Sequence, residues 1–307
     1  MKRLISNSVF FLILLSLLTS ISSAQNDSLE TQGQEFVFPH TLSRLFSVPN
    51  SYIMNSLDLS LLLGGSFGFT DNNGLLGTAG LGLGGYGDIE IGSESLLGSM
   101  FNSKENFTNI GMKIRILSEK ERFPAFAVGI KANNDWNSSR NDEGFIRTAE
   151  SGLFDAGLRA ANYDSRMTSA YAVIGKSFIN SGVNIHAGVN LSDLRYRNVY
   201  VVFNDTSFYS REEEERETIF NFFGGFEYIL NERTLLMFEI QSFPYLKINT
   251  SDGTLSSDRR IVTVAGLRFF ISKWLLLDSG IRYQDNYNGL AEAEIRLGLN
   301  GIWNLGF

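Results

Sequence analysis

The sequence predicts an all-β protein, a closed antiparallel transmembrane β-barrel of about 12 strands with short periplasmic turns and long external loops. Three observations predict it. A secretory leader opens the chain, large residues alternate with small or polar ones in many segments, and short and long connections alternate along the chain. About 10 strands remain possible if the glycine-rich piece at 75–84 is a loop and the first strand is misread, and about 14 if 145–165 forms a hairpin.

The composition excludes several classes of protein. The chain has 307 residues, 30 glycines, no cysteine and a net charge of −7. Without cysteine there are no disulfides, thiolate nucleophiles or zinc–thiolate sites. The acidic balance offers no basic stripe for phosphates, which argues against nucleic acid. The glycine string "GLGLGG" lacks a following helix and a basic partner, so it does not predict a nucleotide site. We expect no cofactor and no metal.

The first residues have the pattern of a signal peptide. Lys2 and Arg3 precede an apolar run at 9–18, and small residues follow at Ser22 and Ala24. The apolar run is too short to span a bilayer. We therefore expect a signal peptide at 1–24, cleaved near Ala24, and a mature chain in the outer membrane of a Gram-negative bacterium.

Residues 25–56 follow without a clean period. They begin with a polar stretch and continue as "VFPHTLSRLFSVPNSYIMN", which carries two prolines. Proline removes a backbone donor and disfavours the interior of a strand. This part is predicted to be a periplasmic or plug-like segment, and the barrel is predicted over 57–307.

From 57 onward the period is two, as in "NIGMKIRIL", where isoleucine and methionine alternate with glycine, lysine and arginine. Strands are predicted at 57–68, 75–84, 86–94, 107–117, 124–133, 168–178, 183–193, 217–229, 234–243, 259–271, 274–284 and 290–303. Short connections are expected at 118–124, 180–182, 231–233 and 272–273, and long ones at 134–166, 194–216 and 244–258. The strands of a soluble β-sandwich also alternate apolar and polar residues, but a sandwich has no reason to alternate short and long connections along the chain.

Charged residues on the polar faces of the predicted strands are the candidate site. They would form a lumen-facing network of Asp88, Glu90, Lys113, Arg115, Asp278, Arg282, Glu292, Glu294 and Arg296. Opposite charges on adjacent strands can pair. The network could form an ion-selective constriction or a polar substrate path. It could equally be a set of salt bridges that fills and braces a narrow interior.

No catalytic residue is predicted. The only histidines are His40 and His186, "GxSxG" is absent, and no serine is obviously poised near His186. The run "REEEERE" at 211–217 is expected in a long loop, where it could bind divalent cations but is more simply a solvated charge run.

The end of the chain carries a resemblance. The alternation through Trp303 and Leu305 to Phe307 resembles the assembly signal of Gram-negative outer-membrane β-barrel proteins. The resemblance implies contact with outer-membrane lipid and lipopolysaccharide and recognition by the barrel-assembly machinery.

A second resemblance covers the first third. The stretches "LFSVPNSYIMNSLDLSLLLGG", "LGLGGYGDIEIGS" and "MKIRILSEKERFPAFAVGIK" resemble the opening blocks of outer-membrane barrels associated with exopolysaccharide secretion. That group often carries a lipid-anchor cysteine, which is missing here, and its chains are longer. The resemblance implies export or assembly of a surface polysaccharide together with polysaccharide export components. It carries over no catalytic residue.

We therefore expect a non-enzymatic outer-membrane barrel acting in export or assembly of a surface polysaccharide. Two alternatives stay open, a passive or substrate-selective pore and a surface adhesin or structural scaffold.

Overall fold

The computed structural model describes residues 42–67, 74–94, 107–133, 136–141, 158–203, 207–211, 214–248, 255–285, 287 and 292–306. The strands are β1 (Asp58–Phe67), β2 (Gly74–Leu83), β3 (Gly87–Glu94), β4 (Phe107–Leu117), β5 (Ala125–Asn133), β6 (Trp136–Asn141), β7 (Leu158–Phe178), β8 (Val183–Phe203), β9 (Ser207–Arg211), β10 (Glu215–Asn231), β11 (Thr234–Ile248), β12 (Leu255–Phe270), β13 (Leu275–Gln284) and β14 (Glu294–Asn304). A 3₁₀ turn, η1 (Ile179–Ser181), lies between β7 and β8. No helix in the described part of the chain is long and apolar enough to cross a membrane.

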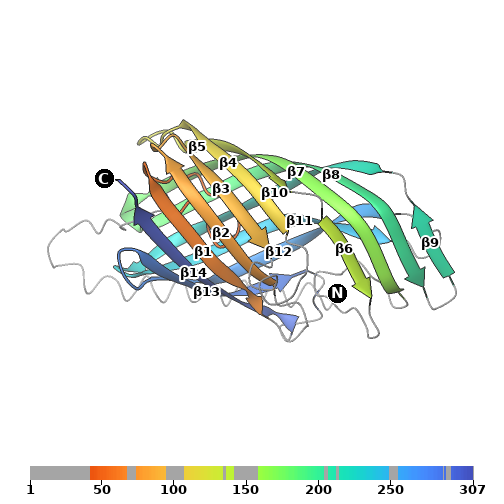
Figure 1. Cartoon of the computed structure of the whole chain (residues 1–307). Coiled ribbons are helices and arrows are strands. Elements are labelled where there is room, and N and C mark those ends of the chain that lie inside the picture. Colours follow the sequence, from red (N-terminus) through yellow and green to blue (C-terminus); the bar gives the residue numbers. More distant parts are fainter. Residues whose placement is uncertain are drawn as a thin grey trace, which may run out of the picture. The chain divides into compact units, whose positions relative to one another are not determined.

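Twelve of these strands close into one antiparallel barrel (Figure 1). The ring runs β7-β5-β4-β3-β2-β1-β14-β13-β12-β11-β10-β8, and pairing of β8 with β7 closes it. β6 pairs with the start of β7 beyond β5, and β9 pairs with the end of β8 beyond β10, so each extends a neighbouring strand of the ring. The predicted fold class and strand number are confirmed.

Several predicted loops are in fact strand. β7 and β8 each span 21 residues and extend well into the expected loops at 134–166 and 194–216. β11 continues to Ile248 and β12 begins at Leu255, which shortens the loop expected at 244–258 to 249–254. Alternation needs two faces in different surroundings. Where both faces of a strand meet similar surroundings, the sequence loses its period and resembles a loop.

The run "REEEERE" is not a loop throughout. Arg211 ends β9, while Glu215–Glu217 begin β10, with Glu214 exposed just before it. The carboxylates of 212 and 213 lie outside the described residues. The strand placement of the last part corrects the expectation of a wholly solvated loop.

Connections alternate between the two ends of the barrel. We call the end with the connections 84–86, 118–124, 179–182, 232–233 and 271–274 the short-turn end, and the opposite end the long-loop end. A β-turn joins β2 to β3, where Gly84 and Gly85 have φ of 68° and 71° and the N–H of Tyr86 donates to the carbonyl of Leu83. Two successive residues with positive φ strongly favour glycine, and this explains the end of the glycine string.

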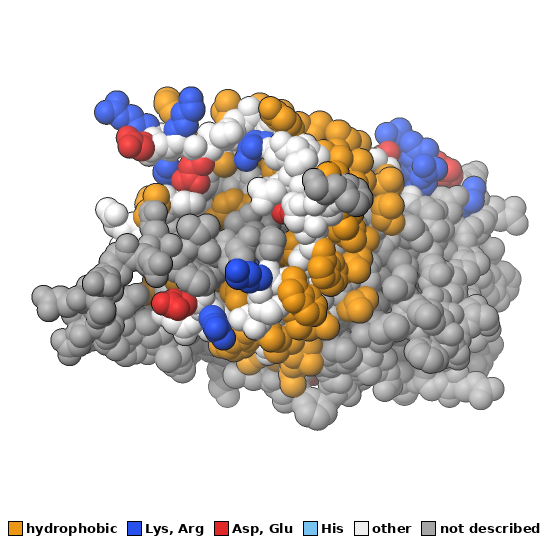
Figure 2. Space-filling model, turned by 60° about the vertical axis from the view of Figure 1, so that its left-hand side comes forward, with side chains coloured by type: hydrophobic (Ala, Val, Ile, Leu, Met, Phe, Trp, Pro, Cys, Tyr) orange, Lys and Arg blue, Asp and Glu red, His pale blue; other side chains and the backbone are white. Residues whose placement is uncertain are grey.

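The outer face of the barrel is apolar. Large hydrophobic side chains are exposed on eleven of the twelve strands of the ring, among them Leu63, Leu83, Ile91, Ile110, Ile130, Ile174, Leu191, Phe220, Ile261, Ile281 and Ile295. On the face drawn in Figure 2, hydrophobic side chains form a band over the described surface. A water-soluble protein rarely exposes a contiguous apolar surface of this extent.

The interior is occupied by the chain's own N-terminal part. Residues 42–56, which we call the inner segment, form no strand and lie against the inward side chains of the barrel just before β1 begins. Leu42, Leu45, Phe46, Val48, Ile53 and Met54 of this segment are all buried.

Candidate functional site: the inner segment and the barrel wall

The inner segment folds into a compact loop. The N–H of Leu45 donates to the carbonyl of Val48 at 3.0 Å, and that of Asn50 donates to the carbonyl of Ser43 at 3.2 Å. The side-chain amide of Asn50 donates to the carbonyl of Leu42 at 2.9 Å and so closes the loop. Its remaining buried backbone N–H and C=O groups need partners elsewhere, because irregular backbone has no ladder to satisfy them.

Lys113 and Asp88 supply the first set of partners. They face each other in register on β4 and β3, with Nζ 3.5 Å from Oδ2. Lys113 donates to three carbonyl oxygens of the inner segment, those of Ser43, Asn50 and Tyr52, at 2.8, 3.3 and 2.5 Å. Asp88 accepts the N–H of Met54 at 2.9 Å. Both side chains are buried, so this ion pair binds backbone rather than water.

Glu239 on β11 supplies the second set. Its carboxylate accepts the N–H groups of Ser47 and Val48 at 2.9 and 3.2 Å, and also the hydroxyl of Ser47. Glu239 is fully buried. A buried carboxylate that accepts two neighbouring N–H groups makes charge-assisted bonds, which are stronger than neutral ones.

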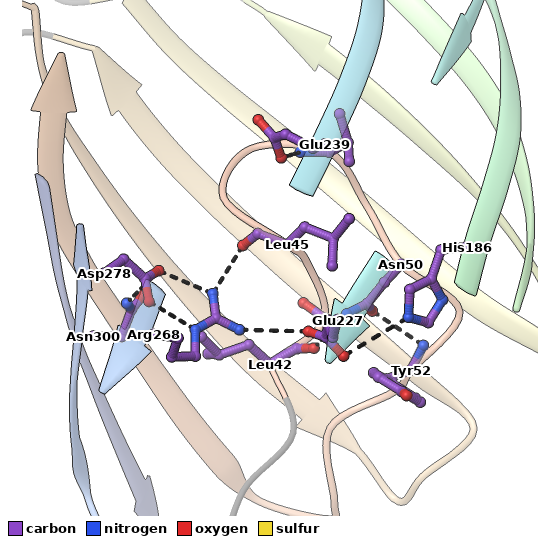
Figure 3. A network of polar contacts seen from close by, with 12 residues as sticks. Leu42, Leu45, Asn50, Tyr52, His186, Glu227, Glu239, Arg268, Asp278 and Asn300 are labelled. Carbon is purple, nitrogen blue, oxygen red and sulfur yellow. Dashed lines mark hydrogen bonds and ion pairs between the residues drawn. The ribbon is translucent and has the colours of Figure 1, made fainter. Parts of the chain in front are cut away.

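Arg268 on β12 joins the inner segment to a buried network (Figure 3). Its guanidinium donates to the carbonyl of Leu45 at 2.9 Å and to both oxygens of Asp278, which lies opposite it in register, at 2.7 and 2.9 Å. Asn300 donates to the same carboxylate at 3.0 Å, and Glu227 lies 3.8 Å from Nη1 of Arg268. The network therefore reaches across β14, β13, β12 and β10 to the inner segment.

His186 ends this network on β8. Its Nδ1 lies 3.3 Å from the hydroxyl of Ser51, its Nε2 lies 3.9 Å from Glu227, and the ring of Tyr52 packs edge-on against it at 4.9 Å. A serine, a histidine and a carboxylate thus lie one after another in space, an arrangement that the amino-acid sequence did not indicate. A hydrolytic site needs a tight, accessible constellation. Here Ser51, His186 and Glu227 are all buried, and the geometry is that of a structural contact.

Apolar packing completes the contact. Leu45 and Val48 form a buried cluster with Ala127, Val173 and Phe223 of the wall. Glycines bring wall and segment together: a Cβ on Gly82 would lie only 2.0 Å from the carbonyl oxygen of Asn55 and 2.9 Å from Cβ of Met54. Glycine is required where two backbones approach this closely.

The remaining predicted network residues have separate partners. Glu90 does not pair with Arg115; it lies 3.5 Å from Arg44 of the inner segment, and Arg115 forms no ion pair with any other described residue. Arg296 donates to the carbonyl of Phe46 and the hydroxyl of Ser66, both at 3.4 Å. Glu90 and Arg296, both predicted members of the network, therefore contact the inner segment.

Other members pair within the wall. Arg282 and Glu294 face each other in register with a contact of 2.8 Å, and the hydroxyl of Tyr287 donates to Glu294 at 2.7 Å. Glu292, predicted on the last strand, precedes β14 and is half-buried.

Of the assembly-signal residues, Trp303 stacks on Trp274 and Leu305 is exposed, while Phe307 lies outside the described residues.

Sequence reasoning missed Arg268, Glu239, Glu227 and Arg44 as network members. Glu239 stands on a polar face of a clearly alternating run, so its position could have been used. Arg268 follows "IVTVAG", where Val262 and Val264 on its own inward face are apolar and buried, and this removes the alternation. The alternation of apolar and polar residues is lost there because an interior filled by protein accommodates apolar as well as polar side chains.

The sequence matches no protein-family model and no curated protein. Solved structures similar to this chain include the translocator domain of the autotransporter NalP from Neisseria meningitidis. The sequence identity is 12% over 96% of this chain and 97% of that one, and the TM-score is 0.42. The outer-membrane protein Omp33 of Acinetobacter baumannii shows 6% identity over 82% and 100% and a TM-score of 0.38. The Pseudomonas putida toluene transporter TodX shows 10% identity over 89% and 97% and a TM-score of 0.37. Similarity at this level does not assign a function to the chain.

Proposed function

We propose that the protein is a non-enzymatic β-barrel of the outer membrane of a Gram-negative bacterium. The apolar band on its outer face supports this placement, because lipid rather than water is the solvent that such a band fits. Closure of the ring leaves no unpaired strand edge to face hydrocarbon. On this proposal the leader is removed near Ala24 and the short-turn end faces the periplasm.

We infer that the inner segment acts as a plug and that the barrel is a gated passage. The observation that supports this is the set of buried wall charges, Lys113, Asp88, Glu239 and Arg268, each of which bonds the backbone of the inner segment. Lys113 and Arg268 also pair with carboxylates of the wall, but a wall that only braced itself would not need these further bonds to the inner segment. When the inner segment leaves, the same charges would line the path.

The transported substance is proposed from the resemblance in the first third of the sequence, which implies a surface polysaccharide. A lumen lined by carboxylates, guanidinium groups and amides offers donors and acceptors to sugar hydroxyl groups. Export components and the barrel-assembly machinery are the partners that this role requires.

Conductance in planar lipid bilayers tests the gated passage. The full chain should insert with little conductance, whereas Glu239→Ala should conduct, because two N–H groups of the inner segment lose their acceptor at roughly 1–3 kcal/mol each. Glu294→Ala is the matched control. It also removes a buried carboxylate, but the partners of Glu294 among the described residues are Arg282 of the wall and Tyr287, and not the inner segment.

Equal behaviour of the two variants would contradict the plug. If both insert and remain silent, the barrel is better described as a surface scaffold. If both conduct, loss of any buried carboxylate opens the barrel, and the inner segment has no special role.

A further inference from the structure

Three arginines stand in a row across adjacent strands near the long-loop end. Arg166 on β7 lies opposite Arg195 on β8, and Arg195 lies opposite Arg216 on β10. We call this row the arginine ladder. Like charges directly opposite each other on neighbouring strands are destabilising. Such a row therefore calls for an anion that contacts several of its members.

The ladder points outward, not into the barrel. Strict alternation places Arg166 on the same face as Ile174, Arg195 on the face of Leu191, and Arg216 on the face of Phe220. Those three hydrophobic side chains are about half exposed and belong to the apolar band. The ladder thus borders the apolar band on the side of the long loops.

The local carboxylates do not neutralise the ladder. Asp193 lies 2.6 Å from Nε of Arg216 and 3.6 Å from Nε of Arg195, and Glu214 lies 3.7 Å from Nη1 of Arg195. Arg166 is exposed and forms no ion pair with any other described residue. Among the described residues, three guanidinium groups thus face two carboxylates, and the surplus positive charge lies beside a hollow of about 120 Å³ lined by Arg166, Thr168, Asp193 and Arg195.

We propose that the arginine ladder binds the phosphate group of an outer-leaflet glycolipid. Guanidinium groups bind phosphate through paired N–H donors, and acyl chains of a lipid whose phosphate sits there would lie along the adjoining apolar band. The surface thus fits a molecule with an anionic head above hydrocarbon. The inference rests on the proposed membrane placement but not on the plug.

The test measures binding of fluorescent lipid A to the full-length protein in mixed detergent micelles. Arg166→Gln/Arg195→Gln/Arg216→Gln should bind at least about tenfold more weakly, since charge-assisted bonds are lost. Arg122→Gln/Arg233→Gln/Lys273→Gln is the matched control, because it removes three exposed cations at the short-turn end and should bind normally. Dephosphorylated lipid A should bind all three proteins equally weakly.

Heat-modifiable migration in detergent gels checks separately that each variant still forms a barrel. Should the triple variant fail to fold, Arg166→Gln alone decides, because this side chain makes no described ion pair and should still weaken binding about threefold. Equal losses in ladder and control variants would overturn the proposal. Displacement of the lipid by inorganic phosphate at comparable concentration would overturn its assignment to a lipid, showing a site for free anions.

Discussion

At the scale of single residues, the buried charges bind peptide groups. Lys113 donates to three carbonyls, and Glu239 accepts two N–H groups and a hydroxyl, all from the inner segment. Removing one partner from a buried ion pair costs about 3–5 kcal/mol because it leaves an uncompensated charge. Release of the inner segment therefore requires water or a ligand to take over these bonds.

Gly82→Ala tests the close approach of wall and segment. The three atoms nearest to a Cβ there all belong to Met54 and Asn55, so the inner segment should be displaced while the barrel stays closed. The chain has no cysteine, so Ile53→Cys, a buried position, gives a clean probe. Maleimide labelling of this thiol should become about tenfold faster in Gly82→Ala, as expected for roughly 1.4 kcal/mol of easier opening.

Gly111→Ala is the control for that substitution. Its added Cβ would lie no closer than 3.4 Å to any atom, so labelling should not change. If Gly82→Ala labels at the rate of the parent protein, the contact with Asn55 does not hold the inner segment in place.

At the scale of elements, the alternation of apolar and polar residues predicted the strands wherever one face is apolar and the other polar. All twelve ring strands overlap the ranges that the sequence predicted, including the glycine-rich β2, which was predicted because a barrel of this kind needs an even number of strands. The extensions of β7, β8 and β11 were predicted as loops, and the continuations β6 and β9 were not predicted as strands. The register itself explains which charges pair: Lys113 with Asp88, and Arg282 with Glu294.

The turn at 118–124 gives a pH-dependent prediction. Partial burial acts to raise the pKa of Glu119, but the N–H and hydroxyl of Ser177 and the ammonium of Lys176 outweigh it and hold the pKa below its usual value. A lowered pKa stabilises the folded state above the unfolded pKa, and that contribution is lost as pH falls through the folded pKa.

Glu119→Gln should therefore lower the guanidinium unfolding midpoint in detergent at pH 7 by an amount equivalent to less than about 1 kcal/mol, since solvent screens this partly exposed ion pair. Near pH 3 the difference should shrink. A difference that is the same at both pH values would mean that the charge of Glu119 does not contribute.

At the scale of the whole molecule, the sequence predicted a barrel wall but not how its interior is filled. The charged wall residues could be placed on one face of the sheet, but their partners in the inner segment lie 34 to 250 positions away in the sequence. No periodicity marks residues 42–56, because their structure is set by contacts with the wall rather than by local pattern.

The apolar band predicts where substitutions will disturb insertion. Ile130 is 60% exposed and lies opposite Met112 near the middle of β4. Ile130→Arg should destabilise the protein in phospholipid vesicles by about 2–4 kcal/mol, as expected for a charge near the midplane. Ile179→Arg, in the turn between β7 and β8, should change stability by far less. Equal unfolding midpoints for the two variants would contradict placement of the band in lipid.

The central claim is that the inner segment closes the barrel, and a covalent lock tests it most directly. The Ser47 hydroxyl lies 3.4 Å from the side-chain amide of Gln241, so Ser47→Cys/Gln241→Cys can be joined by a short dithiol cross-linker. The measurement is bilayer conductance of this pair combined with Glu239→Ala, before and after cross-linking. Our account predicts conductance before cross-linking and a closed barrel afterwards. Equal conductance in the two states would contradict it.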